Sequence, residues 1–194
     1  MDTTYAKPET LIGTALAPLD WVRSVGLVIA FSLLTALAAQ VVIPIGPVPI
    51  TGQTFAVLLT GALLGSRMGA AAMIAYLIEG ASGLPFFYGG GAGIAHLLGP
   101  TGGYLVAFPA AAFITGAFAE HGWDRKFFSA AVAMAIGSIL MMLSGWAWLS
   151  QFMTAGAAFH AGVTKFIAGD IVKIVLAAAA LPIGWKLLKK QSSE

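Results

Sequence analysis

Two opposite charges within one apolar stretch are the first residues in this sequence that could do chemistry. Asp170 and Lys173 are three positions apart, so a helix would place both side chains on one face. A charge buried in such a segment is costly and by default marks a functional site. We expect the pair to contact a polar ligand; the alternative is a structural ion pair that only joins two helices.

Glu79 is the other acid within an apolar stretch. It is compatible with a ligand or proton site and equally with a charge held in water near the outer interface, and the sequence does not choose between them. The chain has no cysteine, no metal-ligand spacing of His and Glu, and no phosphate-binding loop. We therefore expect no metal, no cofactor and no ATP hydrolysis by the chain itself.

Ser82 and His96 offer an enzymatic alternative. The segments around them, Gly80-Ala81-Ser82-Gly83 and Ala95-His96-Leu97-Leu98-Gly99, resemble the serine and histidine motifs of rhomboid intramembrane proteases. Those proteases carry the two residues on different membrane helices with another span between them. The segment between Ser82 and His96 is too short for a span of about 20 residues, so a serine protease is disfavoured.

The composition defines the solvent in which these residues must act. Hydrophobic residues make up 59% of the 194 positions and charged residues 9%, against roughly 25% charged in a soluble domain. Too few polar side chains remain to cover a water-facing surface, so the chain is expected to lie in a lipid bilayer. A net charge of +2 is too small to indicate a nucleic-acid partner.

The apolar tracts predict an all-α integral membrane protein, a compact bundle of six transmembrane helices. The whole chain, 1–194, is expected to form a single domain that begins with a polar segment of about 1–20. Two helices from the stretch 54–82, split at 65–67, are short for full spans. The other four are expected at about 21–42, 102–119, 127–152 and 163–188.

Basic residues predict the orientation of this bundle, because they favour cytoplasmic loops. They fall before the first helix, in alternate connections and after the last helix, which places both termini in the cytoplasm. The residues concerned are Lys7, Arg23, Arg67, Arg125, Lys126, Lys186, Lys189 and Lys190.

The opposite connections, 45–53, 83–93 and 99–104, are uncharged and rich in glycine and proline. Glycine lets a backbone approach a ligand closely. Irregular backbone at membrane depth survives only when it is buried in protein or lines a cavity. We favour loops over a small-molecule pocket; turns packed on the bundle are the alternative.

Four motifs occur here in one order: Pro47-Val48-Pro49-Ile50-Thr51-Gly52-Gln53-Thr54, Gly83-Leu84-Pro85 with its glycine run, Gly99-Pro100-Thr101-Gly102-Gly103-Tyr104, and Ala168-Gly169-Asp170-Ile171-Val172-Lys173. Together they resemble the BioY family, the biotin-binding S components of energy-coupling factor (ECF) vitamin transporters. The resemblance implies a six-helix protein of the bacterial cytoplasmic (inner) membrane that captures biotin near the outer face. It further implies a transmembrane T component and two ATPase subunits as partners, although some members are thought to work alone.

The resemblance also implies roles for individual residues. Asp170 would accept a hydrogen bond from the ureido ring of biotin, and Lys173 would donate to the ureido carbonyl or to the carboxylate. The remaining expected contacts are Val48, Pro49 and Ile50 over the sulfur ring, Gln53 and Tyr104 at the polar ends, and the close-approaching backbone of Gly89, Gly90 and Gly91.

Two departures from the family pattern affect that site. Some members carry asparagine near the position of Gly91, and some carry a basic residue where this chain has Leu105. The partner of the carboxylate therefore stays open among Lys173, Lys165 and Tyr104. A binding component for another small vitamin remains an alternative.

Small residues recur along the first predicted helix at a spacing that permits close helix contact in lipid. The resemblance implies that they form the docking face for the T component. The expected docking residues are Ser32, Thr35, Ala36 and Ala39.

Overall fold

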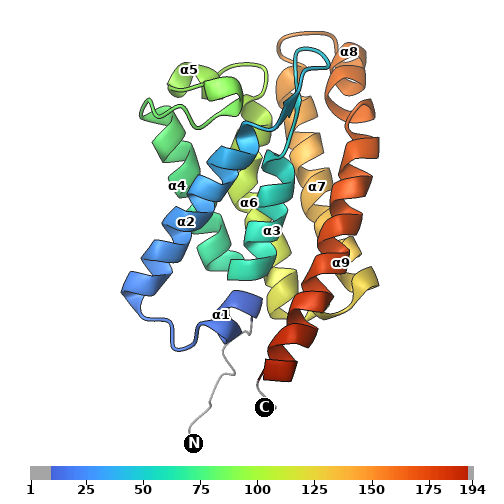
Figure 1. Ribbon diagram of the computed structural model, residues 1–194. Helices are drawn as coiled ribbons and strands as arrows, with labels where there is room; N and C mark the ends of the chain where they lie inside the picture. The colour runs from blue at the N-terminus through green and yellow to red at the C-terminus, as the bar shows by residue number, and fades with distance from the viewer. Residues whose placement is uncertain (1–9, 192–194) are drawn as a thin grey trace, which may run out of the picture.

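A computed structural model describes residues 10–191, which are mostly helical (Figure 1). Six longer helices form the body of the molecule: α2 (Trp21–Ala39), α3 (Gln53–Leu64), α4 (Ser66–Ala81), α6 (Gly102–Glu120), α7 (Phe127–Leu149) and α9 (Ile167–Gln191). The shorter elements are α1 (Leu11–Ala15), β1 (Val42–Ile43), β2 (Ile50–Thr51), η1 (Tyr88–Gly90), α5 (Ile94–Leu97), η2 (Trp123–Arg125), α8 (Ala155–Phe159) and the π-helical η3 (His160–Thr164). The prediction of a helical protein is confirmed in that the described residues are mostly helical, with one short strand pair.

Within residues 10–191, four helical segments are long and apolar enough to cross a membrane: Trp21–Ala39, Gly102–Glu120, Phe127–Leu149 and Ala155–Lys190. The other two helices are shorter, with 12 residues in α3 and 16 in α4. At about 1.5 Å per residue they reach roughly 18 and 24 Å, less than the roughly 30 Å of hydrocarbon. The structure thus supports four full spans, and the count of six stays a prediction.

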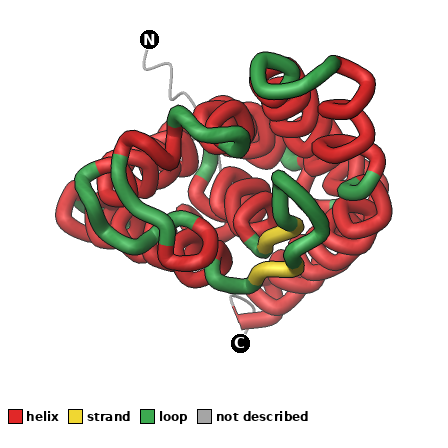
Figure 2. Tube along the Cα trace, turned by 90° about the horizontal axis from the view of Figure 1, so that it is seen from above, coloured by secondary structure: helices red, strands yellow, loops and turns green. Residues whose placement is uncertain are grey.

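The shortness of α3 is explained by its position inside the bundle. Figure 2 shows it near the middle of the molecule, surrounded by other helices, and most of its residues are buried. A helix shielded by protein needs neither the length nor the lipid-facing surface of a full span. Gly65, with a φ of +88°, turns the chain from α3 into α4, so the predicted break at 65–67 is confirmed.

The irregular elements gather at two opposite ends of the bundle. The strand pair, α5 and α8 lie at one end, whereas α1 and the last turns of α9 lie at the other (Figure 1). By chain order, Arg23, Arg67 and Arg125 stand at helix ends on the α1 side. This is the alternation on which the predicted orientation depends, although Lys7 lies outside the described residues.

The lower half of α9 is anchored to the connection between α6 and α7. The indole nitrogen of Trp185 donates a hydrogen bond of 2.6 Å to Oδ2 of the buried Asp124, and the guanidinium of Arg125 lies 4.7 Å from the centre of the same indole ring. Burial raises the pKa of the Asp124 carboxyl, while the bond from Trp185 opposes that rise. The anchor fixes the helix that carries Asp170 and Lys173 in its upper half.

Candidate functional site

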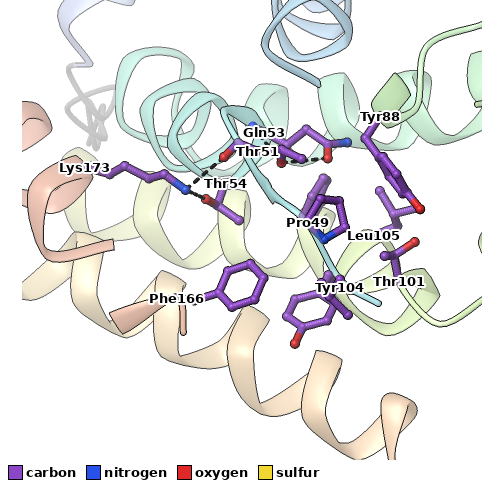
Figure 3. A pocket seen from close by; sticks show the side chains of 12 residues that line it. Pro49, Thr51, Gln53, Thr54, Tyr88, Thr101, Tyr104, Leu105, Phe166 and Lys173 are labelled. Carbon is purple, nitrogen blue, oxygen red and sulfur yellow. Dashed lines mark hydrogen bonds between the residues drawn. The ribbon is translucent and has the colours of Figure 1, made fainter. Parts of the chain in front are cut away.

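A pocket lies among the strand-pair loop, the first turns of α3 and α6, and α9 (Figure 3). It contains about 410 Å³ that protein atoms do not fill, counting the part open to solvent. Small-molecule sites are mostly apolar with a few polar groups, and the lining of this pocket has that composition. The lining residues are Val48, Pro49, Thr51, Gln53, Thr54, Tyr88, Thr101, Tyr104, Leu105, Phe108, Phe166 and Lys173.

The apolar roof of the pocket comes from the loop between the two strands. β1 and β2 pair antiparallel, with Val42 opposite Thr51, and the loop between them carries Val48 and Pro49 into buried positions over the pocket. Ile50 does not line the pocket; its Cγ2 instead lies 3.9 Å from where a side chain at Gly169 of α9 would begin. Two of the three residues predicted to cover an apolar ring are therefore in place.

Lys173 joins three parts of the chain at one end of the pocket. Its Nζ donates to the carbonyl of Thr51 at 2.9 Å, to Oγ1 of Thr54 at 2.7 Å, and to Oδ1 of Asp170 at 3.3 Å. An ammonium group has three donors, so these contacts occupy all of them. Lys173 thus lines the pocket and also fastens the strand pair to α3 and α9.

Asp170 lies behind Lys173 rather than on the pocket surface. It is 6% exposed, and its Oδ2 accepts a hydrogen bond of 2.5 Å from Ser138 of α7. The two residues share a helix face, as their spacing predicted. The carboxylate therefore orients and neutralises Lys173, and a direct bond from Asp170 to a ligand stays a prediction.

Gln53 is the centre of a buried polar chain beneath the strand pair. Its Oε1 accepts a bond of 2.9 Å from Thr51, and its Nε2 donates to the hydroxyl of Tyr76 at 2.5 Å. The Tyr76 hydroxyl in turn donates to the carbonyl of Phe86 at 3.1 Å. This chain links the loop above α4 to the first turn of α3 and holds the Gln53 amide in one orientation.

Tyr104 forms an aromatic wall of the pocket with Phe166, their ring centres being 6.1 Å apart and nearly parallel. The Tyr104 hydroxyl donates to the carbonyl of Gly162 at 2.6 Å. Gly162 lies in the π-helical turn η3, where the regular helical bonding is displaced and a carbonyl can accept from elsewhere. The hydroxyl predicted to meet a ligand is thus already bonded within the protein.

The glycine run shapes the pocket indirectly. Gly89 and Gly90 have φ values of +63° and +73°, a left-handed turn that glycine adopts without strain. Gln40 holds this turn, accepting from the Gly90 amide at 3.0 Å and donating to the Phe87 carbonyl at 3.1 Å. Gly89, Gly90 and Gly91 do not line the pocket, whereas the neighbouring Tyr88 does.

The predicted docking face on α2 is corrected by the structure. Ser32, Thr35, Ala36 and Ala39 are all buried, and Oγ1 of Thr35 lies 3.9 Å from the sulfur of Met73 on α4. These small residues permit close packing of α2 within the bundle and are not exposed on its surface. Gly26 and Ala30 have the same spacing and remain exposed.

The two residues of the protease alternative do not form a catalytic pair. The hydroxyl of Ser82 donates to the carbonyl of Glu79 at 2.7 Å, and the His96 ring stacks on Phe87 with centres 5.0 Å apart. Within residues 10–191 no hydrogen bond joins Ser82 to His96. Glu79 is half-buried outside the pocket, with one carboxylate oxygen buried and unbonded, so its role stays open.

Seven lining residues were not among the predicted site residues. Thr51, Thr54, Tyr88 and Thr101 lie inside the motifs and loops identified in the sequence, so their position was a usable signal. Leu105 follows the third motif and was noted only as a departure. Phe108 and Phe166 carried no signal, because a single aromatic residue in an apolar helix is indistinguishable from core packing.

Comparison with known proteins identifies a family model and several relatives that match this chain. The family model described as "BioY family" matches residues 7–190. A protein of Pyrococcus horikoshii named "Probable biotin transporter BioY" is 44% identical over 165 residues, which cover 85% of this chain and 96% of the relative. "Biotin transporter BioY" of Rhizobium etli is 36% identical over 181 residues, covering 80% and 95%.

A solved structure shares the fold. It is a crystal structure of the S-component for biotin from an ECF-type ABC transporter, with a TM-score of 0.78 and 28% sequence identity. The match covers 85% of this chain and 92% of that chain.

Proposed function

Since the chain belongs to the BioY family, we propose that it captures biotin and serves its uptake across the cytoplasmic membrane. The curated relatives described above are biotin transporters, and the fold matches the S-component for biotin. The chain is accordingly a transport protein rather than an enzyme.

The observation that carries the proposal is the convergence of the sequence motifs on one pocket. The strand-pair loop, the glycine-rich loop, the start of α6 and the charge pair of α9 are far apart in sequence and contribute Pro49, Tyr88, Tyr104 and Lys173 to the same lining. Biotin has a polar ureido ring, an apolar sulfur ring and an acidic tail. Val48 and Pro49 suit the sulfur ring, and a ureido carbonyl at the opposite end would replace one of the bonds that Lys173 makes to Thr51, Thr54 or Asp170.

Calorimetric titration of the purified full chain with biotin tests this proposal, with thiamine and riboflavin as controls. We expect tight, saturable binding of biotin alone. Binding of one of the other vitamins instead would support the alternative of a different vitamin. Ser82→Ala is expected to leave biotin affinity and uptake unchanged, because Ser82 lies outside the pocket; loss of activity in this variant would revive the protease alternative.

For transport we propose that the chain works with an ECF T component and two ATPase subunits. The structural relative comes from an ECF-type transporter, and α2 retains one exposed pair of small residues, Gly26 and Ala30. Such a pair allows a second helix to approach closely in lipid. We place the docking face there instead of on the buried side of α2.

Gly26→Leu tests this face, because no heavy atom lies within 4 Å of a side chain built there. The substitution should leave the fold and biotin binding intact while reducing ATPase-dependent uptake in cells by about tenfold or more. Ala179→Leu, an exposed small residue on α9, is the matched control and should transport normally. Normal uptake by Gly26→Leu would remove this pair from any docking face.

We further propose six membrane-embedded helices with both termini in the cytoplasm. The longer helices α2, α3, α4, α6, α7 and α9 alternate in direction, so an even number of crossings returns the chain to the side where it began (Figure 1). The basic residues at the α1 end favour the cytoplasm for that side. The pocket, at the opposite end, would then open toward the outside.

A further inference from the structure

We infer that the pocket holds the tail of its ligand through the neutral hydroxyl groups of Tyr88 and Thr101, so that uncharged derivatives of biotin bind nearly as well as biotin itself. This inference rests on the proposed function. It specifies the class of ligand: a bicyclic ureido compound whose tail ends in a carbonyl group, with or without a negative charge.

The lining of the pocket carries little net charge. Lys173 is the one charged side chain among the residues that line the pocket within the described part of the chain. Its ammonium group is bonded to Thr51, Thr54 and Asp170, and the Asp170 carboxylate at 3.3 Å offsets its charge. A ligand carboxylate near Lys173 would therefore meet a neutral pair whose donors are already in use.

The opposite end of the pocket is uncharged. Figure 3 shows Tyr88, Thr101 and Leu105 together at the end away from Lys173. Leu105 is 3% exposed and fills this corner with an apolar side chain. A carboxylate at this end would find no cation in the lining to offset the cost of leaving water.

Cations elsewhere at this end of the molecule do not alter that conclusion. The exposed Lys165 donates from its Nζ to the carbonyl of Ile45 at 2.9 Å and is not part of the lining. His96 stacks on Phe87 and Tyr88 behind the pocket wall, and burial lowers the pKa of its imidazole, which favours the neutral form. Neither group lines the pocket in this structure.

Most polar side chains of the lining are already hydrogen-bonded within the protein, and two are not. The polar side chains of Thr51, Gln53, Thr54 and Tyr104 are all bonded to other parts of the protein. By contrast, the structure records no hydrogen bond of the Tyr88 or Thr101 hydroxyl within residues 10–191, and Figure 3 draws none from either hydroxyl to another lining residue. These two hydroxyls are thus the free polar side-chain groups of the lining, and they lie at its uncharged end.

Hydroxyl groups both donate and accept hydrogen bonds. They can donate to a carboxylate, to an ester carbonyl or to an amide carbonyl, and they can accept from an amide N–H. An arginine or lysine would favour the carboxylate strongly, because a charge-assisted bond is about twice as strong as a neutral one. A site built from hydroxyls selects for an oxygen at the end of the tail and only weakly for its charge.

Titration of the full chain with biotin, biotinamide and biotin methyl ester tests the inference. We expect the dissociation constants of both neutral derivatives to lie within about threefold of that of biotin. Tyr88→Phe should weaken the three ligands by the same factor of about three to ten, as expected for a lost neutral bond. A Tyr88→Phe variant with unchanged affinity for all three would overturn the role of that hydroxyl.

Leu105→Arg should create the selectivity that the wild type lacks. With a cation at the tail end, biotin should gain at least about tenfold over biotinamide. Leu105→Met, of similar volume and uncharged, is the matched control and should keep the wild-type ratio. The wild-type ratio decides the inference even if the arginine variant does not fold.

The three titrations distinguish a failure of the inference about the ligand tail from a failure of the proposed biotin-binding function. Tight binding of biotin with binding of biotinamide weaker by about thirtyfold or more would overturn the inference alone, and would indicate that Lys173 leaves Thr51 to pair with the carboxylate. Absence of binding by all three ligands would refute the proposed function and the inference together.

Discussion

Replacement of Lys173 by methionine is expected to weaken biotin binding by about tenfold to a hundredfold. Lys173 lines the pocket and holds the strand pair through the carbonyl of Thr51 and the hydroxyl of Thr54. Hydrogen bonds of charged groups contribute about 1.5–3 kcal/mol each, and about 1.4 kcal/mol corresponds to tenfold in affinity. Methionine keeps the unbranched shape of the side chain, is one heavy atom shorter, and removes all three donors.

The same change should also destabilise the fold. Asp170, 6% exposed, would keep its bond from Ser138 but lose its counter-charge. Removing one partner of a buried ion pair typically costs about 3–5 kcal/mol, because the remaining charge is left uncompensated. Thermal unfolding in detergent should therefore show a lower midpoint for Lys173→Met, measured beside the calorimetric titration.

A double variant separates the two effects. Asp170→Asn combined with Lys173→Met removes both charges and should recover much of the lost stability without recovering biotin affinity. Lys165→Met is the control, since Lys165 is exposed, lies outside the lining and donates a hydrogen bond to the carbonyl of Ile45. Wild-type affinity in Lys173→Met would exclude this residue from the binding site.

The charge pair shows how far the sequence could predict the site. Helical spacing alone placed Asp170 and Lys173 on one face, and the structure has them 3.3 Å apart. The different positions of the two groups, one on the pocket surface and one behind it, depend on Thr51, Thr54 and Ser138. Those contacts join residues far apart in sequence, and no local pattern encodes them.

The exposed side of α2 could not be predicted for a related reason. An apolar helix in a membrane lacks the polar stripe that identifies the outer side of a soluble helix. Small residues occur on several sides of α2. Their spacing therefore indicates that another helix packs closely against α2, but it does not indicate on which side. The structure places Ser32 and Thr35 inward and leaves Gly26 exposed.

The glycine run uses the conformational freedom expected of glycine, while its contact with a ligand stays a prediction. Its conformational freedom is used, since Gly89 and Gly90 have positive φ values. However, that freedom makes a turn that presents Tyr88 to the pocket, and the glycine backbone itself lies outside the lining. The hydrogen bond between Gln40 and the Gly90 amide fixes this turn and so determines that Tyr88 faces the pocket. Gln40 is far from the glycine run in sequence, so no local pattern predicts this bond.

Gly145→Ala is expected to disrupt the aromatic wall of the pocket by overpacking it. A Cβ at this position of α7 would overlap the ring of Tyr104, which is held from the other side by Gly162 and by the stack with Phe166. Overpacking of a well-filled site costs about 1–3 kcal/mol and sometimes more. The ring can relieve the overlap only by breaking its bond to Gly162 or by moving into the pocket.

Both routes should reduce biotin affinity by about tenfold or more, and displacement of the ring should also lower the unfolding midpoint. Gly156→Ala is the matched control, because no heavy atom lies within 4 Å of a side chain there and the residue is exposed in α8. Tyr104→Leu should make Gly145→Ala less destabilising, since the smaller side chain vacates the space that alanine needs. If the two substitutions act on stability independently, the packing of Tyr104 against α7 is not what shapes this wall of the pocket.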